Sequence, residues 1–234
     1  MRILIISDIH SNMAALRAVF EAEEFDACVC AGDVVDYGCD PSEVVNWMQE
    51  NTVACVRGNH DHAVGQKVRP RGGLGLRHLA FATRPLHWQW MSDDQLRWLS
   101  QLPTSQFVEL DAKRFYLVHG TPRDPLEEYL GPKQEDWQHR LNNIDADFVC
   151  VGHTHQPYLL ELDNGTTVVN PGSVGQPRNL DPRAAYAIYE NGAVTLKQVE
   201  YAIEDAIASY RAAGLPEDVC DLAFQTLADG GLRL

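Results

Sequence analysis

The sequence predicts an α/β protein with a mostly parallel sheet, and three features support this prediction. Up to Arg57, short apolar runs rich in β-branched residues alternate with helix-like stretches. Each of these runs ends abruptly in a cluster of polar residues. Beyond Pro103 the pattern changes to pairs of strands joined by short turns. Alternating strands and helices are typical of βαβ units, to which the later pairs add antiparallel strands.

The opening of the chain predicts the elements of such βαβ units. Buried strands are expected over residues 3–6, 27–31 and 53–57, and helices over residues 13–23 and from residue 41. Asn12 or Ser11 can cap the first helix. Asp40 is a capping residue for the second helix, and Pro41 suits its first helical position. The chain therefore runs strand, helix, strand, helix, strand.

Residues 62–103 fit this alternation less well. Residues 78–83 can form a short helix, and the aromatic residues 87–90 can either pack in the core or cover a site. A capping box beginning at Ser92 starts a helix that Pro103 stops. We therefore expect a lid or insertion at about residues 62–103.

The rest of the chain predicts three hairpins and further helices. Paired strands are expected over 107–110 and 115–119, over 158–162 and 166–169, and over 186–189 and 194–199. A single strand over 148–151, a helix over 137–141 and helices over 203–213 and 217–228 complete the set. No segment reads as a linker, so we expect one domain over residues 1–234 with a C-terminal helical extension at about 202–234.

Composition limits the partners of the protein. The chain of 234 residues carries a net charge of −14, which disfavours long nucleic acid, because such binding relies on Lys and Arg. No apolar run approaches the ~20 residues that span a bilayer, so no membrane partner is expected. The six cysteines include no Cys-x-x-Cys pair, and no signal-peptide pattern is present. We expect a cytoplasmic protein with reduced thiols. The sequence does not define the oligomeric state, and a homo-oligomer is one of the alternatives.

Polar side chains follow the expected strands in a repeated manner. Asp8 and His10 end the first strand, and strand alternation would place them on one side of the sheet. Together with later strand ends they form a set of carboxylates, imidazoles and one carboxamide: Asp8, His10, Asp33, Asn59, His60, His119, His153 and His155. This mixture of ligand types suits Mn²⁺, Fe or Zn²⁺.

The joint pattern resembles the calcineurin-like metallophosphoesterase superfamily, and within it the small prokaryotic phosphodiesterase-like branch. The motifs that carry the resemblance are Asp8-x-His10, Gly32-Asp33, Gly58-Asn59-His60-Asp61, Val118-His119-Gly120, Gly152-His153-Thr154-His155 and the stretch Asn170 to Arg178. The resemblance implies a four-layer α/β/β/α sandwich of two mixed β-sheets flanked by helices.

The resemblance also implies roles for these residues. Asp8, His10 and His155 resemble the ligands of one metal, Asn59, His119 and His153 those of a second metal, and Asp33 the bridging carboxylate. His60 is similar to a histidine that donates a hydrogen bond or proton to the reacting phosphate. Asp61 would orient the His60 ring, or else cap a helix or form a salt bridge. Asn12 and Arg178 are candidate substrate contacts, with helix capping and a surface salt bridge as their alternatives.

The implied activity is hydrolysis of phosphoric esters by a hydroxide that bridges two divalent metal ions. Mn²⁺ is favoured, with Fe, Zn²⁺, Ni²⁺ or Mg²⁺ as alternatives, and the expected substrates are phosphodiesters of small nucleotide-like molecules. A phosphomonoesterase and a phosphoprotein phosphatase remain alternatives. The superfamily also includes a retromer subunit that serves as a binding module, so a metal-binding interaction scaffold is a third alternative.

Overall fold

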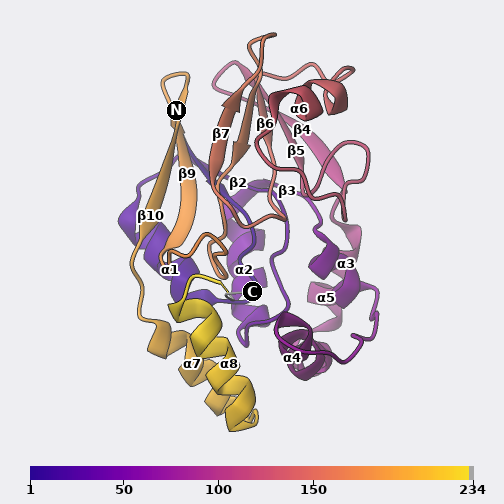
Figure 1. Ribbon diagram of the computed structural model, residues 1–234, viewed down its shortest axis with the longest axis vertical. Helices are drawn as coiled ribbons and strands as arrows, with labels where there is room; N and C mark the ends of the chain where they lie inside the picture. The colour runs from indigo at the N-terminus through magenta and orange to yellow at the C-terminus, as the bar shows by residue number, and fades with distance from the viewer. Residues whose placement is uncertain (232–234) are drawn as a thin grey trace.

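The computed structural model describes residues 1–231 and contains two mixed sheets of five strands each (Figure 1). The first sheet has the order β10-β9-β1-β2-β3 and comprises β1 (Arg2–Ile6), β2 (Ala27–Cys30), β3 (Thr52–Cys55), β9 (Ala184–Glu190) and β10 (Ala193–Val199). In it, β1, β2 and β3 run parallel, whereas β9 pairs antiparallel with both β1 and β10. The predicted βαβ opening is confirmed.

The second sheet collects the middle of the chain in the order β4-β5-β6-β8-β7. Its strands are β4 (Ser105–Leu110), β5 (Lys113–Val118), β6 (Phe148–Cys150), β7 (Tyr158–Glu161) and β8 (Thr167–Asn170). β5, β6 and β8 run parallel, and β4 and β7 pair antiparallel at the two edges. The three predicted hairpins are therefore present as β4–β5, β7–β8 and β9–β10.

The two sheets pack face to face over a shared apolar core. On β1, Ile3 and Ile5 point into this core, where they meet Phe115 of the second sheet. Leu4 and Ile6 point to the opposite face, into the cluster formed with the helices. All four side chains are fully buried, which explains why the first strand reads as a continuous apolar run.

Helices cover the outer faces of both sheets. They are α1 (Met13–Ala22), α2 (Pro41–Asn51), α3 (Asn59–Gly65), α4 (Leu76–Trp90), α5 (Asp93–Gln101), α6 (Gln134–Arg140), α7 (Ile203–Ala212) and α8 (Glu217–Ala228). Leu16, Met48 and Leu99, from α1, α2 and α5, pack on the first sheet, and Trp137 from α6 packs on the second. The four-layer sandwich of the predicted fold class is confirmed.

Two of the expected helix starts are modified by the structure. Asn12, and not Ser11, caps α1, because its Oδ1 accepts the Ala15 amide at 3.0 Å. Asp40 precedes α2 as expected, but its side chain makes no capping hydrogen bond. The capping box at Ser92 is confirmed at the start of α5.

Residues 62–103 contain more helix than the sequence predicts. The short helix expected over 78–83 extends to Trp90, and the aromatic residues 87–90 form its last turn. His87 is fully buried, and its Nε2 hydrogen-bonds to the Gly38 carbonyl oxygen at 2.8 Å. This part of the chain therefore packs against the loop after β2.

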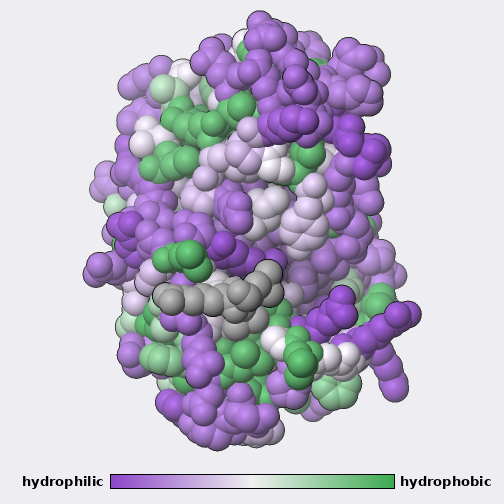
Figure 2. Space-filling view, viewed as in Figure 1, coloured by the Kyte–Doolittle hydropathy of each residue, from purple (hydrophilic) through white to green (hydrophobic). Residues whose placement is uncertain are grey.

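The helices α7 and α8 lie side by side and contact that same loop (Figure 1). Tyr210 is buried and donates its hydroxyl hydrogen to the Tyr37 carbonyl oxygen at 3.0 Å. Of the expected extension over 202–234, residues 232–234 lie outside the described residues. Within the described part, no helix is long and apolar enough to cross a membrane. Hydrophilic residues cover most of the face in Figure 2, with hydrophobic residues in small groups.

One partly buried charge network fixes the loop that follows β5. The Glu128 carboxylate accepts hydrogen bonds from Arg140 at 2.8 Å and from Thr121. The Glu128 side chain is 10% exposed. Its hydrogen bonds to Arg140, and then its contacts with Thr121 and Arg123, lower the pKa of Glu128 to about 2. A lowered pKa in the folded state contributes stability above the unfolded value of ~4.3, which is lost as the pH falls toward the folded value.

We therefore expect Glu128→Gln to lower the free energy of unfolding by about 1–2 kcal/mol at pH 7. The difference from the wild type should shrink as the pH falls from 4.5 to 2, because the wild-type carboxylate then also loses its charge. Urea unfolding followed across this pH range measures the effect. Glu127→Gln, at an exposed neighbouring position, is the matched control and should change little. An equal loss at every pH would contradict the electrostatic account.

Candidate metal centre

The seven expected metal ligands converge at one edge of the two sheets. Six of them lie in loops that follow β1, β2, β5 and β6, and Asn59 begins α3 just after β3; these five strands run parallel within their own sheets. Open α/β sheets bind ligands at the carboxyl ends of such strands. The structure groups them as Asp8, His10 and His155 in a first cluster and Asp33, His119 and His153 in a second, with Asn59 beside His119.

The first cluster is compact and buried. Asp8 Oδ1 lies 3.2 Å from His155 Nε2, and His10 Nε2 lies 3.3 Å from the same nitrogen. The ligand atoms of these three residues all lie within 4.8 Å of one another. These atoms can therefore surround one small cation.

The second cluster is held next to the first by Asp33. Asp33 Oδ2 lies 3.1 Å from His119 Nε2 and 3.8 Å from His10 Nε2 of the first cluster. The Asn59 Oδ1 atom lies 3.2 Å from His119 Nε2. Asp33 therefore stands between the two clusters, in the place that a bridging carboxylate requires.

Backbone carbonyl groups fix the orientation of three of the imidazole rings. The Nδ1 atoms bond as follows: His10 to Val35 O at 3.2 Å, His119 to Ala31 O at 2.9 Å, and His155 to Gln176 O at 2.5 Å. A carbonyl oxygen only accepts, so each Nδ1 carries the proton in the hydrogen-bonded tautomer. Each Nε2 then presents a lone pair toward the clusters, as metal-binding histidines do.

The donor set fits divalent cations. With Nδ1 protonated, the Nε2 atoms of His10 and His155 are two acceptors that face each other at 3.3 Å without a hydrogen between them. Asp33 Oδ2 and His153 Nε2 are buried and, within residues 1–231, lack a hydrogen-bond partner. Buried polar atoms without partners are costly, and a cation in each cluster would satisfy them.

The pKa values of the buried carboxylates and imidazoles are shifted strongly from their usual values. Burial raises the pKa of Asp8 to about 7 and lowers the pKa of His10 to about 3. Burial also lowers the pKa of His153 to about 4. Burial also acts to lower the pKa of His119, but the Asp33 carboxylate outweighs burial and raises this pKa to about 10. The site thus favours positive charge beside Asp33, which metal ions would supply.

The backbone at the ligands is in an uncommon conformation. The φ angles of Asp8, His10, Asp33, His153 and His155 are 54°, 51°, 54°, 66° and 57°, all in the left-handed region. β1 ends at Ile6, so Asp8 and His10 lie in a turn beyond the strand. The expectation that strand alternation places them together was therefore wrong, although both reach the first cluster.

Close packing explains the glycines that precede the ligands. A Cβ atom on Gly58 would lie 2.0 Å from Asp33 Oδ1, and one on Gly152 would lie 2.7 Å from Asp8 Oδ2. Both distances are shorter than any real contact of this type. Side chains at these positions would displace the two carboxylates.

A buried carboxylate that the sequence analysis missed orients His60. The His60 Nδ1 atom lies 2.6 Å from Asp36 Oδ2, which also accepts hydrogen bonds from Arg84 Nε at 3.0 Å and Arg84 Nη2 at 2.5 Å. Asp36 is fully buried, and its φ angle is 78°. The signal for it in the sequence was its position three residues after Asp33 of the Gly32-Asp33 motif.

Asp61 makes different contacts. Its Oδ1 accepts the amides of Val34 at 2.8 Å and Val35 at 3.1 Å, and its Oδ2 accepts the Gly58 amide at 3.0 Å. The expectation that Asp61 orients His60 was therefore wrong, since Asp36 makes that contact. The hydrogen bonds agree with the alternative, a cap at the start of α3.

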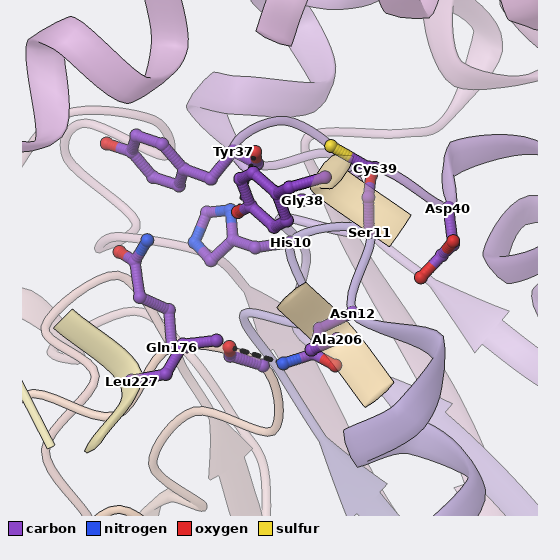
Figure 3. Close-up of a pocket in the computed structure, with 12 residues that line it drawn as sticks. His10, Ser11, Asn12, Tyr37, Gly38, Cys39, Asp40, Gln176, Ala206 and Leu227 are labelled. Atoms are coloured by element: carbon purple, nitrogen blue, oxygen red, sulfur yellow. Dashed lines mark hydrogen bonds between the residues drawn. The ribbon is translucent and has the colours of Figure 1, made fainter. Parts of the chain in front are cut away.

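The two candidate substrate contacts differ in availability. Asn12 Nδ2 donates to the Gly175 carbonyl oxygen at 3.0 Å, so both ends of its amide are engaged within the protein (Figure 3). Figure 3 also shows His10 and Gln176 lining the same small cavity. Arg178 is half-buried and donates to Gln176 Oε1 at 3.0 Å. After burial, the Arg178 charge is the next cause that lowers the pKa of His155, so the guanidinium lies near the first cluster.

The fold and the two clusters define an α/β protein with a candidate dinuclear metal centre at the strand ends. The family model of the calcineurin-like phosphoesterase superfamily domain matches residues 1–192, and the chain belongs to this family. The family uses divalent metal ions, which agrees with the donor set described above. Its class of reaction is the hydrolysis of phosphate esters.

Individual relatives agree with this family. An uncharacterized protein of Methanocaldococcus jannaschii is 31% identical over 92% of this chain and 94% of its own length. The crystal structure of a metallophosphoesterase from Sphaerobacter thermophilus is 34% identical, with a TM-score of 0.79 over 98% of this chain and 99% of that chain. A hypothetical protein from Pyrococcus horikoshii shares the fold, with a TM-score of 0.82 at 21% identity and 99% coverage of both chains.

The geometry predicts two metal ions per chain and a partial loss when one cluster is disrupted. We expect His10→Ala to bind about one ion fewer than the wild type, because His10 belongs to the first cluster. Elemental analysis after loading with Mn²⁺ and gel filtration measures the stoichiometry. His139→Ala, at an exposed position, is the control and should retain the wild-type content. Equal metal content in both variants would contradict the assignment of the first cluster.

Proposed function

We propose that the protein hydrolyses phosphoric esters, with diesters of small nucleotide-like molecules as its preferred substrates and Mn²⁺ as its favoured metal ion. The observation that carries the proposal is Asp33 Oδ2, which lies buried between two clusters of metal-binding side chains. Asp8, His10 and His155 would hold one cation, and Asn59, His119 and His153 the other. Two cations bound there would supply an activated water and would neutralise charge on the phosphoryl oxygens.

His60 is the residue that acts on the leaving group in this proposal. The centroid of its ring lies 5.0 Å from that of the His10 ring. Asp36 binds the Nδ1 atom, so Nε2 is the ring nitrogen that remains for the leaving group. Burial lowers the pKa of His60, but Asp33 and Asp36 outweigh burial and raise the pKa above its usual value. A protonated imidazole can donate to the departing oxygen as charge develops there.

The alternatives are a phosphomonoesterase, a phosphoprotein phosphatase and a metal-binding scaffold without turnover. Every side chain that the proposed reaction needs is present at the site, which favours an enzyme over a scaffold. The net charge of −14 favours a small substrate over a long nucleic acid. The cytoplasmic location stays a prediction from the sequence.

Hydrolysis of bis(p-nitrophenyl) phosphate by metal-stripped protein, with and without added Mn²⁺, tests the proposal. We expect turnover that depends on Mn²⁺ and falls by about 10²–10⁴-fold in His60→Ala, while the metal content stays unchanged. His139→Ala is the matched control. Turnover of p-nitrophenyl phosphate without turnover of bis(p-nitrophenyl) phosphate would identify a monoesterase. Metal binding without turnover of either ester would favour the scaffold, and no metal binding would overturn the proposal.

Asp36 and Asp61 should differ in the effect of the same substitution. Asp36→Asn should lower kcat by about tenfold or more with little change in metal content, because the amide orients His60 less well. Asp61→Asn should mainly lower the free energy of unfolding, since the side chain accepts three backbone amide hydrogens. Steady-state kinetics combined with urea unfolding separate the two outcomes. Similar effects of both variants on kcat at unchanged stability would contradict these roles.

A further inference from the structure

A groove with a volume of about 960 Å³ lies beside the metal centre. Its walls come from parts of the chain far apart in sequence: residues 73–77 and 129–131, together with Thr154, Gln156, Arg178, Leu180 and Gly231. Thr154 lies between the two ligands of the Gly-His-Thr-His motif. The volume is at the upper end of the ~300–1,000 Å³ range of small-molecule sites.

Tyr129 connects this groove to the metal centre. The centroid of its ring lies 3.8 Å from that of His153, and the residue is 59% exposed. One face of the Tyr129 ring therefore covers a candidate ligand while the side chain also lines the groove. A flat group placed in the groove next to the reacting phosphate would reach this aromatic ring.

The walls combine apolar side chains with positive charge. Leu74 and Leu180 are 93% and 66% exposed, which is unusual for leucine and leaves apolar surface free on two sides of the groove. Arg77 and Arg178 line the same groove in a chain whose net charge is −14. The Arg178 Nε atom is buried and, among the described residues, has no hydrogen-bond partner.

Tyr129 and Arg178 lie together inside the groove. Burial raises the pKa of the Tyr129 hydroxyl, and the adjacent Arg178 guanidinium opposes this rise. A guanidinium pairs well with the oxygens of a phosphate group, and an aromatic ring stacks on the face of a nucleobase. The two side chains thus offer complementary contacts to one ligand.

We propose that this groove binds the part of the substrate that is not hydrolysed, and that this part is a nucleoside carrying a second phosphate group. The base stacks on Tyr129 between the apolar walls, and Arg178 binds the phosphate that does not react. The proposal rests on the proposed function, because it places the ester bond at the metal centre. It assigns substrate specificity to side chains that lie outside the two metal clusters.

Equilibrium dialysis in the presence of EDTA tests binding without metal ions or turnover. We expect adenosine 5′-diphosphate to bind about tenfold more tightly than either pyrophosphate or adenosine alone. Tyr129→Ala and Arg178→Ala should each weaken this binding by about tenfold, whereas Tyr129→Phe should retain it. Arg183→Ala, at an exposed arginine that pairs with Asp181, is the matched control. Equal affinities for the three ligands, or no effect of the groove variants, would overturn the inference.

A kinetic comparison separates failure of the inference from failure of the proposed function. With Mn²⁺, the ratio of kcat/KM for the p-nitrophenyl ester of thymidine 5′-phosphate to that for methyl p-nitrophenyl phosphate should fall about tenfold in Tyr129→Ala. An unchanged ratio would overturn the inference while leaving the phosphoesterase function in place. No turnover of either ester, with nucleotide binding intact in dialysis, would overturn the proposed function and support the groove as a nucleotide site.

Discussion

The site depends on the buried carboxylate of Asp33. Its Oδ1 accepts the His60 amide at 2.9 Å, which ties the start of α3 to the loop after β2. Its Oδ2 faces His119 at 3.1 Å and His10 at 3.8 Å, so one oxygen connects both clusters. Several acceptors are thus buried around a single point, an arrangement that costs free energy unless cations occupy it. The same cost favours binding of cations at the two clusters.

A rigid scaffold is needed to hold such an arrangement. Left-handed φ angles at the ligands cost about 1–3 kcal/mol each and persist only where the surroundings fix them. The fixed surroundings are the parallel strands, whose carboxyl ends are held by the core between the sheets. Backbone carbonyl groups of Ala31, Val35 and Gln176 then set the ring orientation of three histidines. The fold supplies both the position and the direction of the donor atoms.

Local sequence patterns were sufficient for the strands and the hairpins, because each depends on neighbours along the chain. The candidate ligands, which the structure groups into two clusters, came from the family resemblance of the motifs. Contacts between distant residues were not predictable in this way. Asp36 and Arg84 are 48 positions apart, and no local pattern links them. Asp61 was expected to contact its neighbour His60, but the first turn of α3 directs its carboxylate to the amides of residues 34 and 35. Helix α4 exceeds its predicted length because buried residues such as His87 hold its last turn in place.

One loop carries residues of both the groove and the candidate metal centre. His119 directly follows β5, and Thr121 two residues later donates to Glu128, which Arg140 of α6 also holds. Tyr129 follows Glu128 directly, so the network that fixes the loop after a candidate ligand also fixes the aromatic wall of the groove. Changes in this loop would therefore move Tyr129 and the candidate ligand His119 together. Residues 73–77, Arg178 and Leu180 include no candidate ligand, so these walls can vary in sequence with less cost to the candidate metal centre.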